Sequence, residues 1–476
     1  MKEEIIRLEK ITQIIDGVTL LDALNLHIFK NEIFGLLCIN DHGKEALIQL
    51  ICQNIPINFG NVYFLDYLAN SYKHRTRSAN EVLVIEKPIR LIEDLSVVDN
   101  VFLLQHRNKK YFTEDLQDYI DKLGLNIDPA ALVADLSFYE KCLVLLVKAY
   151  IMDVKLVILR DISNFISAVD MKKINTLLKK LVSEEMTFLY ICNNHEEAFK
   201  ICDRVALMEN GRVVKILDNK HFNDEVIKAY TLDFYHNTED ENSTKKNRGT
   251  VLSFKEVTTD NMRKISFDIY KGECVTFLDI NNTVLNDIVN LLNSTLRPSE
   301  GRIELEGVVV KRGNRLKRNI EIIAENATQT MVFAEMSCID NLCFLVDKKM
   351  NGVWVGQKIK KSVIAEYKEY FGEDLYAGDI YDLSIVSLYN LVYYRIHLLT
   401  PKIAVCVQPF SDADMYLRHQ IIGLINKLLE KGISVIILAV NISDTLYVSD
   451  RLFVVEKGRI KEEYSSKNFY KFKRDN

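Results

Sequence analysis

The feature that most constrains this chain of 476 residues is an internal repeat. Six short segments recur in the same order, first at an offset of 241 residues and later at an offset of 247. The matched segments are Lys30-Asn31-Glu32 with Lys271-Gly272-Glu273, Gly60 with Gly301, Asp99-Asn100 with Asp340-Asn341, Leu136-Ser137 with Leu383-Ser384, CDRV from Cys202 with SDRL from Ser449, and ENGR from Glu209 with EKGR from Glu456. Six anchors with one small change of length predict two copies of one domain of about 240 residues.

The join between the two copies is visible in the composition. The segment HNTEDENSTKKNRGT is polar and charged and has no apolar periodicity, which is typical of a solvated linker. We therefore predict a first domain over residues 1–235, a linker over residues 236–250 and a second domain over residues 251–476.

Short apolar runs alternate with helical periodicity inside each copy. In the first copy, IFGLLCIN and VKLVILRD have the pattern of buried strands, whereas EALIQLICQNI and DMKKINTLLKKLVSEE have the spacing of helices. This alternation predicts an α/β fold with a mostly parallel sheet covered on both faces. Ligands of such sheets bind beyond the carboxyl ends of the strands, so the loops that begin near Cys38, Arg160 and Asn193 are the candidate site.

Composition excludes several classes of protein. A formal net charge of −5 provides no basic field, so we expect no nucleic-acid partner. Nine cysteines without a CxxC pair fit scattered core thiols, and we expect no structural metal. The longest apolar runs are six to eight residues, far below the roughly 18 that span a bilayer. We therefore expect a cytoplasmic protein, peripheral on the inner face of the cell membrane at most and not inserted into it.

In the order of its loops, the chain resembles the tandem ATP-binding subunits of ATP-binding-cassette importers, most closely those for ribose, galactose and similar sugars. The resemblance covers nearly the whole chain and includes IDGVTLLDALNLHIFKNEIFGLL, the DN segment before the helical subdomain, and CDRVALMENGRVV. It implies two tandem P-loop NTPase-like nucleotide-binding domains, each with a mixed sheet core and a helical subdomain. It also implies ATP and magnesium as ligands, and membrane permease subunits or an intact cassette protein as partners.

The phosphate loop of this family has the form GxxxxGK[ST], in which Gly lets backbone N–H groups converge on phosphate, Lys reaches the outer phosphates and the hydroxyl ligates magnesium. The matching stretch keeps Gly43 and Lys44, whereas Cys38 replaces the first Gly and Glu45 replaces the hydroxyl. The resemblance implies these nucleotide-binding positions: Asn40, Gly43, Lys44, Glu45 and Ala46.

The other catalytic positions of the first copy have also changed. Arg160 stands where the family places its magnesium-binding aspartate, and Asp161 stands at the position of the catalytic base with a side chain one methylene shorter. Lys87 replaces the glutamine that senses the metal, and Asn193 replaces the histidine that contacts the outer phosphate.

Glu45 beside a phosphate oxygen at ~4 Å would cost about 4 kcal/mol at an effective dielectric near 20. Since Glu45 and Arg160 flank one metal position and carry opposite charges, we expect them to form an ion pair that fills the vacated metal site. The alternative is independent drift of both residues to solvated side chains.

In the second copy the loop from Asp279 to Asn286 has no Gly, no Lys and no terminal hydroxyl. The degenerate positions of this copy are Asp279, Asn282, Asn286, Val407, Gln408 and Asn441, with Val407 and Gln408 in place of two acids. We expect no nucleotide there.

The signature motif LSGGQ survives in both copies only as Leu-Ser, with Ser137 and Ser384. Bulky side chains follow where glycines would let a phosphate approach, so we interpret both serines as helix N-caps. With the metal ligands replaced in both copies, no catalytic set is intact and no metal site is expected. Whether ATP and magnesium still bind at Gly43-Lys44 stays open.

Three functions follow from this pattern. The first is a pseudo-ATPase subunit, with weak or no hydrolysis, that associates with a membrane permease or an intact cassette partner. The second is an active ATPase subunit of a sugar importer, and the third is a regulatory or scaffold protein outside transport.

Overall fold

The computed structural model describes most of the chain, and the account below concerns these residues: 3–52, 55, 57–65, 67–69, 82–103, 109–222, 249–310, 316, 319–344, 346, 356–411 and 413–469. The chain divides into two compact units, Met1–Asp233 (unit 1) and Phe234–Asn476 (unit 2). Of the linker predicted over residues 236–250, residues 236–248 lie outside the described ranges and Thr250 is the first residue of a strand. The predicted domain limits stay a prediction.

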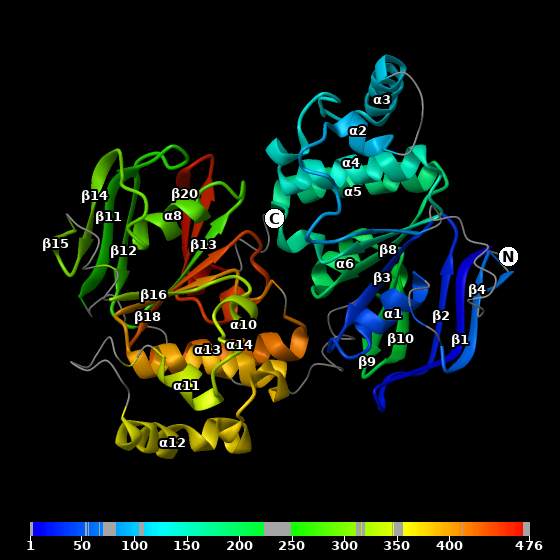
Figure 1. Ribbon diagram of the computed structural model, residues 1–476. Coiled ribbons are helices and arrows are strands. Elements are labelled where there is room, and N and C mark those ends of the chain that lie inside the picture. The colour runs from blue at the N-terminus through cyan, green and yellow to red at the C-terminus, as the bar shows by residue number, and fades with distance from the viewer. Residues whose placement is uncertain are drawn as a thin grey trace. The chain divides into compact units, whose positions relative to one another are not determined.

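Unit 1 contains one antiparallel and one mostly parallel sheet (Figure 1). The antiparallel sheet has the order β2-β1-β4-β5, with β1 Glu4–Ile15, β2 Val18–Phe29, β4 Phe59–Phe64 and β5 Tyr67–Leu68. The second sheet has the order β10-β9-β3-β8-β7-β6, with β3 Ile33–Cys38, β6 Val82–Ile85, β7 Leu156–Arg160, β8 Thr187–Cys192, β9 Arg204–Glu209 and β10 Arg212–Asp218. Its strands pair in parallel except at the β9–β10 edge. β3 and β8 are buried along their whole length, as expected for strands covered on both faces.

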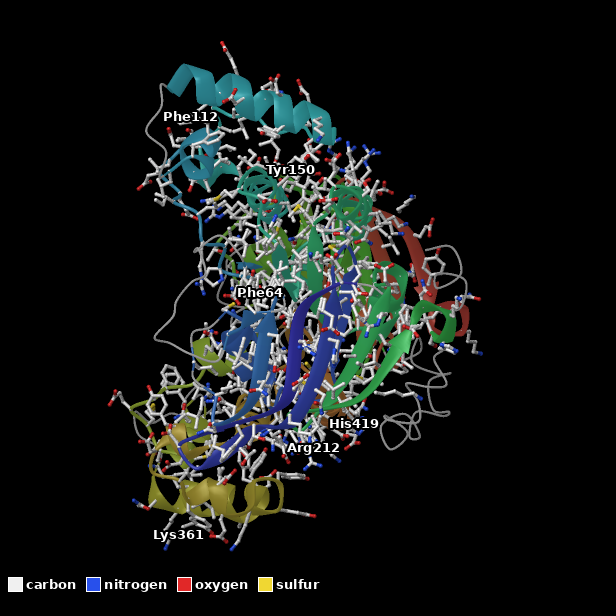
Figure 2. The ribbon with its side chains drawn as sticks, turned by 90° about the vertical axis from the view of Figure 1, so that its right-hand side faces the viewer. Phe64, Phe112, Tyr150, Arg212, Lys361 and His419 are labelled. Carbon is white, nitrogen blue, oxygen red and sulfur yellow. The ribbon has the colours of Figure 1, made fainter. Side chains whose placement is uncertain are left out.

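The helices of unit 1 are α1 Lys44–Ile51, α2 Val97–Val101, α3 Lys109–Leu123, α4 Phe138–Ile151, α5 Ala168–Ser183 and α6 His195–Ile201. Figure 1 shows α2, α3 and α4 gathered at one end of this unit, which is the expected helical subdomain. Phe112 on α3 stacks on Phe102 at a centroid distance of 4.5 Å. Figure 2 shows Phe112 and Tyr150 in this helical part and Phe64 on β4 of the antiparallel sheet.

Unit 2 repeats the strand order of unit 1. Its antiparallel sheet is β12-β11-β14-β15, with β11 Thr250–Thr258, β12 Ile265–Tyr270, β14 Glu300–Leu305 and β15 Val308–Val309. Its second sheet is β16-β17-β18-β13-β19-β20, with β13 Cys274–Asp279, β16 Ile320–Ile323, β17 Ile403–Val407, β18 Ser434–Ala439, β19 Arg451–Glu456 and β20 Arg459–Ser465. Its helices are α8 Leu285–Leu292, α10 Ala327–Thr330, α11 Cys338–Cys343, α12 Gln357–Phe371, α13 Ile385–Leu399 and α14 Met415–Glu430. The predicted tandem α/β fold is confirmed.

Two anchors of the sequence repeat correspond to a buried ion pair in each unit. In unit 1, Arg204 at the start of β9 donates to Glu32 at 3.0 Å, just before β3. In unit 2, Arg451 donates to Glu273 at 3.1 Å in the equivalent place. Each pair joins two neighbouring parallel strands at their amino ends, which explains why KNE or KGE and the later DR recur together.

The nine cysteines are free thiols, and all except Cys52 are buried, as the sequence predicts. Among the helices within the described ranges, none has both the length and the apolar character needed to cross a membrane.

Candidate nucleotide sites

The predicted site of unit 1 assembles where β3, β7 and β8 end. The loop after β3 leads into α1, whose first residues are Lys44 and Glu45, and β7 ends at Arg160. Because these parallel strands share one carboxyl edge, two adjacent pairs of residues from distant parts of the sequence meet there, namely Lys44 and Glu45 with Arg160 and Asp161.

Lys44 is held by two carboxylates of the protein. Its Nζ lies 2.6 Å from Oδ1 of Asp41 and 3.4 Å from Oδ2 of Asp161, and the residue is only 5% exposed. Burial lowers the pKa of the ammonium, but Asp161 and Asp41 outweigh burial and hold this pKa well above its usual value. The ammonium of Lys44, to which the resemblance gives the role of binding phosphate, is therefore already neutralised by carboxylates of the chain itself.

The predicted ion pair between Glu45 and Arg160 is confirmed. A guanidinium nitrogen of Arg160 lies 2.6 Å from Oε2 of Glu45 and 3.1 Å from Oε2 of Glu86. Gln49 donates to the other oxygen of Glu45 at 2.7 Å, one helical turn along α1. Burial raises the pKa of Glu45, but Gln49 and Arg160 outweigh it and the pKa is lowered.

Asp161, at the position of the catalytic base, faces Lys44. The residue has a left-handed backbone with φ 50°, and its N–H donates to the carbonyl of Ile191 at 2.9 Å. Its Oδ2 lies 3.9 Å from Nε of Arg160, while its buried Oδ1 accepts no hydrogen bond from the residues that the structure describes. This carboxylate thus lies between two cations.

Gly43 and Asn40 hold the loop against neighbouring strands, Gly43 by close packing and Asn40 by hydrogen bonds. Gly43 has φ 81°, and a Cβ there would lie 2.3 Å from the carbonyl oxygen of Leu20 on β2, so packing alone demands glycine. The side chain of Asn40 donates to Oδ1 of Asn210 at 2.8 Å and accepts from the N–H of Asn210 at 3.1 Å, which ties the loop to the β9–β10 turn. The side chain of Ala46 lies in the core.

The two remaining predicted positions of unit 1 are Lys87 and Asn193. The ammonium of Lys87 lies 4.0 Å from the ring centroid of Phe165, a cation–π contact. Asn193 follows β8 and is buried, with 6% of its surface exposed. Their predicted roles stay predictions.

In unit 2, Asp279 occupies the loop after β13 in a way that the sequence reading missed. Its Oδ2 accepts the backbone N–H groups of Thr283 and Val284, each at 2.6 Å, and its Oδ1 accepts that of Asn281 at 3.2 Å. The side chain is fully buried. The signal available in the sequence was an acid shortly before a helix whose N-cap position, Val284, has no polar side chain.

The other second-copy positions present no charged side chain. Asn282 and Asn286 are exposed, and Asn282 has a left-handed backbone with φ 52°. Val407 ends β17, and Gln408 has φ 46°, like Asp161 in unit 1. Asn441 is half-buried after β18.

The interpretation of the signature serines as helix caps is confirmed. Ser137 caps α4, accepting the N–H of Glu140 at 3.3 Å, while the Glu140 carboxylate accepts the N–H of Ser137 at 2.8 Å. Ser384 caps α13 through the N–H of Ser387 at 3.1 Å. Phe138, at a glycine position of the motif, packs edge-on against Phe165 at 5.3 Å.

Magnesium fits these residues poorly. At the metal position of unit 1 the Glu45 carboxylate is already bound by the Arg160 cation, and a second cation there would be repelled. Within the described ranges, no group of three or more His, Cys, Asp and Glu side chains is placed to hold a metal ion.

Comparison with known proteins gives relatives along nearly the whole chain. It is 22% identical over 484 residues to the galactose/methyl galactoside import ATP-binding protein MglA of Salmonella typhimurium, covering 96% of this chain and 94% of that protein. It is 21% identical over 481 residues to the ribose import ATP-binding protein RbsA of Caldanaerobacter subterraneus, covering 97% and 96%. The solved complex of archaeal ribosomal stalk protein aP1 and ribosome recycling factor aABCE1 has a similar fold, with a TM-score of 0.64 and 16% identity over 98% of this chain and 92% of that chain. No family model matches the chain.

Proposed function

Because the chain is a tandem ATP-binding-cassette protein homologous to galactose- and ribose-import ATP-binding proteins, we propose that it is a pseudo-ATPase subunit. In this proposal it hydrolyses ATP weakly or not at all, and it acts by binding membrane permease subunits or an intact cassette partner. Its place would be at the inner face of the cell membrane, in the cytoplasm.

The observation that carries this proposal is that both cations of the unit 1 site, Lys44 and Arg160, are already paired with carboxylates of the chain. Phosphoryl transfer depends on a lysine and a metal ion that neutralise charge on the transferred group. Here the Lys44 ammonium is already paired with Asp41 and Asp161, and Arg160 stands at the metal position paired with Glu45. A nucleotide would have to break these pairs before its phosphates could reach either cation.

Binding to a permease is supported by two matched pairs of exposed apolar side chains. In unit 1 these are Ile92, 46% exposed, and Leu103, 48% exposed. In unit 2 the residues at the offset of 241 are Phe333, 38% exposed, and Phe344, 43% exposed, with ring centroids 4.2 Å apart. The same kind of surface at the same place in both units suits a partner that offers two equivalent contact segments.

An asparagine holds the segment in place in each unit. In unit 1 the side chain of Asn100 accepts the N–H of Ile92 at 2.8 Å and donates to the carbonyl of Ile92 at 2.9 Å. In unit 2 Asn341 makes the same two bonds to Phe333, at 2.9 and 2.8 Å. The exposed apolar residue is thus fixed by the DN segment that the repeat had marked.

The pseudo-ATPase proposal is tested by titrating ATP into the full chain with and without magnesium, alongside an ATPase assay. We expect no magnesium-dependent increase in affinity and no turnover above that of Lys44→Ala. Micromolar affinity that requires magnesium, together with turnover abolished by Lys44→Ala, would establish the alternative of an active sugar-importer ATPase.

The partner proposal has its own test. Phe333→Asp and Ile92→Asp place a charge on the exposed apolar pairs, and Val169→Asp, at a 44% exposed residue near the start of α5, serves as the control. Co-purification with co-expressed membrane permease subunits should be lost in the first two variants and kept in the third. Equal recovery of all three would show that these side chains do not contact the permease, whereas failure of the unmodified chain to co-purify with it would favour the alternative of a regulatory or scaffold protein outside transport.

A further inference from the structure

The loop between β13 and α8 is closed by one buried carboxylate. Oδ2 of Asp279 accepts two backbone N–H groups, from Thr283 and Val284, and Oδ1 accepts a third, from Asn281. The distances are 2.6, 2.6 and 3.2 Å, and none of the Asp279 surface is exposed. Three N–H donors on one carboxylate form an anion nest whose anion belongs to the chain.

This nest is the counterpart of the phosphate loop. β13 has the same neighbours in its sheet as β3 in unit 1, and α8 begins at Leu285, 241 residues after Lys44. Asn281 also repeats the anchoring role of Asn40, because its side chain accepts the N–H of Lys457 at 2.8 Å in the following strand turn. The loop therefore keeps its course although its glycines and lysine are gone.

The N-cap position of α8 supplies no acceptor for the N–H groups of the first turn, and the first-turn carboxylate of Asp287 accepts from the side chains of Thr259 and Asn261. Val284 stands at the N-cap with its side chain buried in the core, so it offers no side-chain acceptor. The N–H groups at a helix N-terminus carry partial positive charge and require an acceptor. Asp279 supplies one from five residues upstream.

We propose that Asp279 is an intramolecular substitute for phosphate, occupying the anion nest of unit 2 and excluding the phosphates of a nucleotide from it. The phosphate-binding groups of the two units are then occupied in different ways. In unit 1 carboxylates pair with the lysine, and in unit 2 one carboxylate accepts the backbone N–H groups of the loop. The inference deepens the proposed function by giving the physical reason why unit 2 needs no nucleotide to keep its loop folded.

The test is chemical rescue of Asp279→Gly in the full chain by inorganic phosphate. Removal of the carboxylate should lower the Tm of the affected transition by roughly 1 to 8 °C, the range for loss of a helix cap in a domain of this size. Phosphate should restore part of this loss with saturation, relative to chloride at matched ionic strength. The wild-type Tm should not respond to phosphate, and Asn282→Gly, an exposed position in the same loop, is the matched control.

Two results would overturn the inference. One is Asp279→Gly without any phosphate response, and the other is an equal response in Asn282→Gly or in the wild type. If Asp279→Gly does not fold, hydrogen exchange in Asp279→Asn decides, because the amides of Thr283 and Val284 should exchange at least tenfold faster than in the wild type. Unchanged exchange would contradict the proposal. Magnesium-dependent ATP binding together with turnover that is abolished by Lys44→Ala would refute the pseudo-ATPase function and leave these results on unit 2 intact.

Discussion

The guanidinium of Arg160 lies 2.6 Å from the carboxylate of Glu45, which joins the end of β7 to the first turn of α1. These side chains are 115 residues apart in sequence, and they carry opposite charges at the same strand edge. Opposite charges in direct contact stabilise each other here, and Glu86 provides Arg160 with a second carboxylate at 3.1 Å.

A double-mutant cycle should detect this coupling. Glu45→Gln and Arg160→Met each remove one partner, and we expect an interaction free energy of roughly 0.5 to 1 kcal/mol, since the Glu45 side chain is 56% exposed and solvent screens the pair. Arg160→Met should lower the free energy of unfolding more than Glu45→Gln does, because it also removes the ion pair between Arg160 and Glu86. Urea unfolding of the four proteins measures the cycle, and strictly additive effects would mean that the pair contributes nothing.

The same pair predicts a dependence of stability on pH. The pKa of Glu45 is lowered in the folded chain, so its stabilising effect is complete above the ordinary carboxyl pKa of 4.5 and is lost as the pH falls through the folded value. The difference in unfolding free energy between wild type and Glu45→Gln should therefore shrink from pH 7 to pH 4. Its size should stay below about 1 kcal/mol because of exposure to solvent. A difference that grows on acidification would contradict the assignment.

Lys44 should contribute to stability even without a ligand. Lys44→Met leaves the Asp161 carboxylate, whose side chain is 17% exposed, facing only the more distant Arg160. Removing one partner of a buried ion pair costs about 3 to 5 kcal/mol of stability. We expect Lys44→Met to cost roughly 2 to 3 kcal/mol, because Asp41 is 40% exposed and water can solvate its carboxylate. Lys155→Met, which removes an exposed pair with Asp153, is the control and should cost about 0.5 kcal/mol or less. Equal losses would show that Lys44 is not structurally engaged.

The repeat and the periodicity were enough to predict the fold, because the anchors mark real contacts. KNE and DR recur since Glu32 meets Arg204 and Glu273 meets Arg451, and DN recurs since its asparagine fixes a loop. The Glu45–Arg160 pair was also within reach of the sequence, since the resemblance placed both residues at one metal.

The filled loop of unit 2 was not predicted, because Asp279 was considered only as a degenerate position of a phosphate loop. Asp279 accepts N–H groups from residues four and five positions later in the chain. These hydrogen bonds depend on the path of the loop backbone, which a comparison of single residues with a motif does not show. The partners of Lys44 were missed for a similar reason. Asp161 was considered only as a base, whereas the fold places it 3.4 Å from the ammonium.

The buried pair of unit 2 offers a strong test of the packing. Arg451→Met leaves Glu273, which is 2% exposed, without its cation, and we expect a loss of about 3 to 5 kcal/mol. Glu463→Gln removes the other partner of Arg451, but that carboxylate is 46% exposed and the loss should stay below about 1 kcal/mol. Chemical denaturation of both variants measures the contrast, and losses of similar size would contradict a dominant buried pair.

Gly43 should prove essential for folding whether or not ATP binds. Gly43→Ala places a Cβ 2.3 Å from the carbonyl oxygen of Leu20 and also imposes φ 81° on alanine, so we expect a loss of roughly 2 to 4 kcal/mol. Gly17→Ala is the matched control, because Gly17 has φ 79° and nothing lies within 4 Å of its added Cβ. That variant should lose only about 1 kcal/mol from backbone strain. Thermal unfolding without nucleotide separates the two effects, and a Gly43→Ala variant as stable as Gly17→Ala would show that the loop yields and that its glycine is kept for another reason.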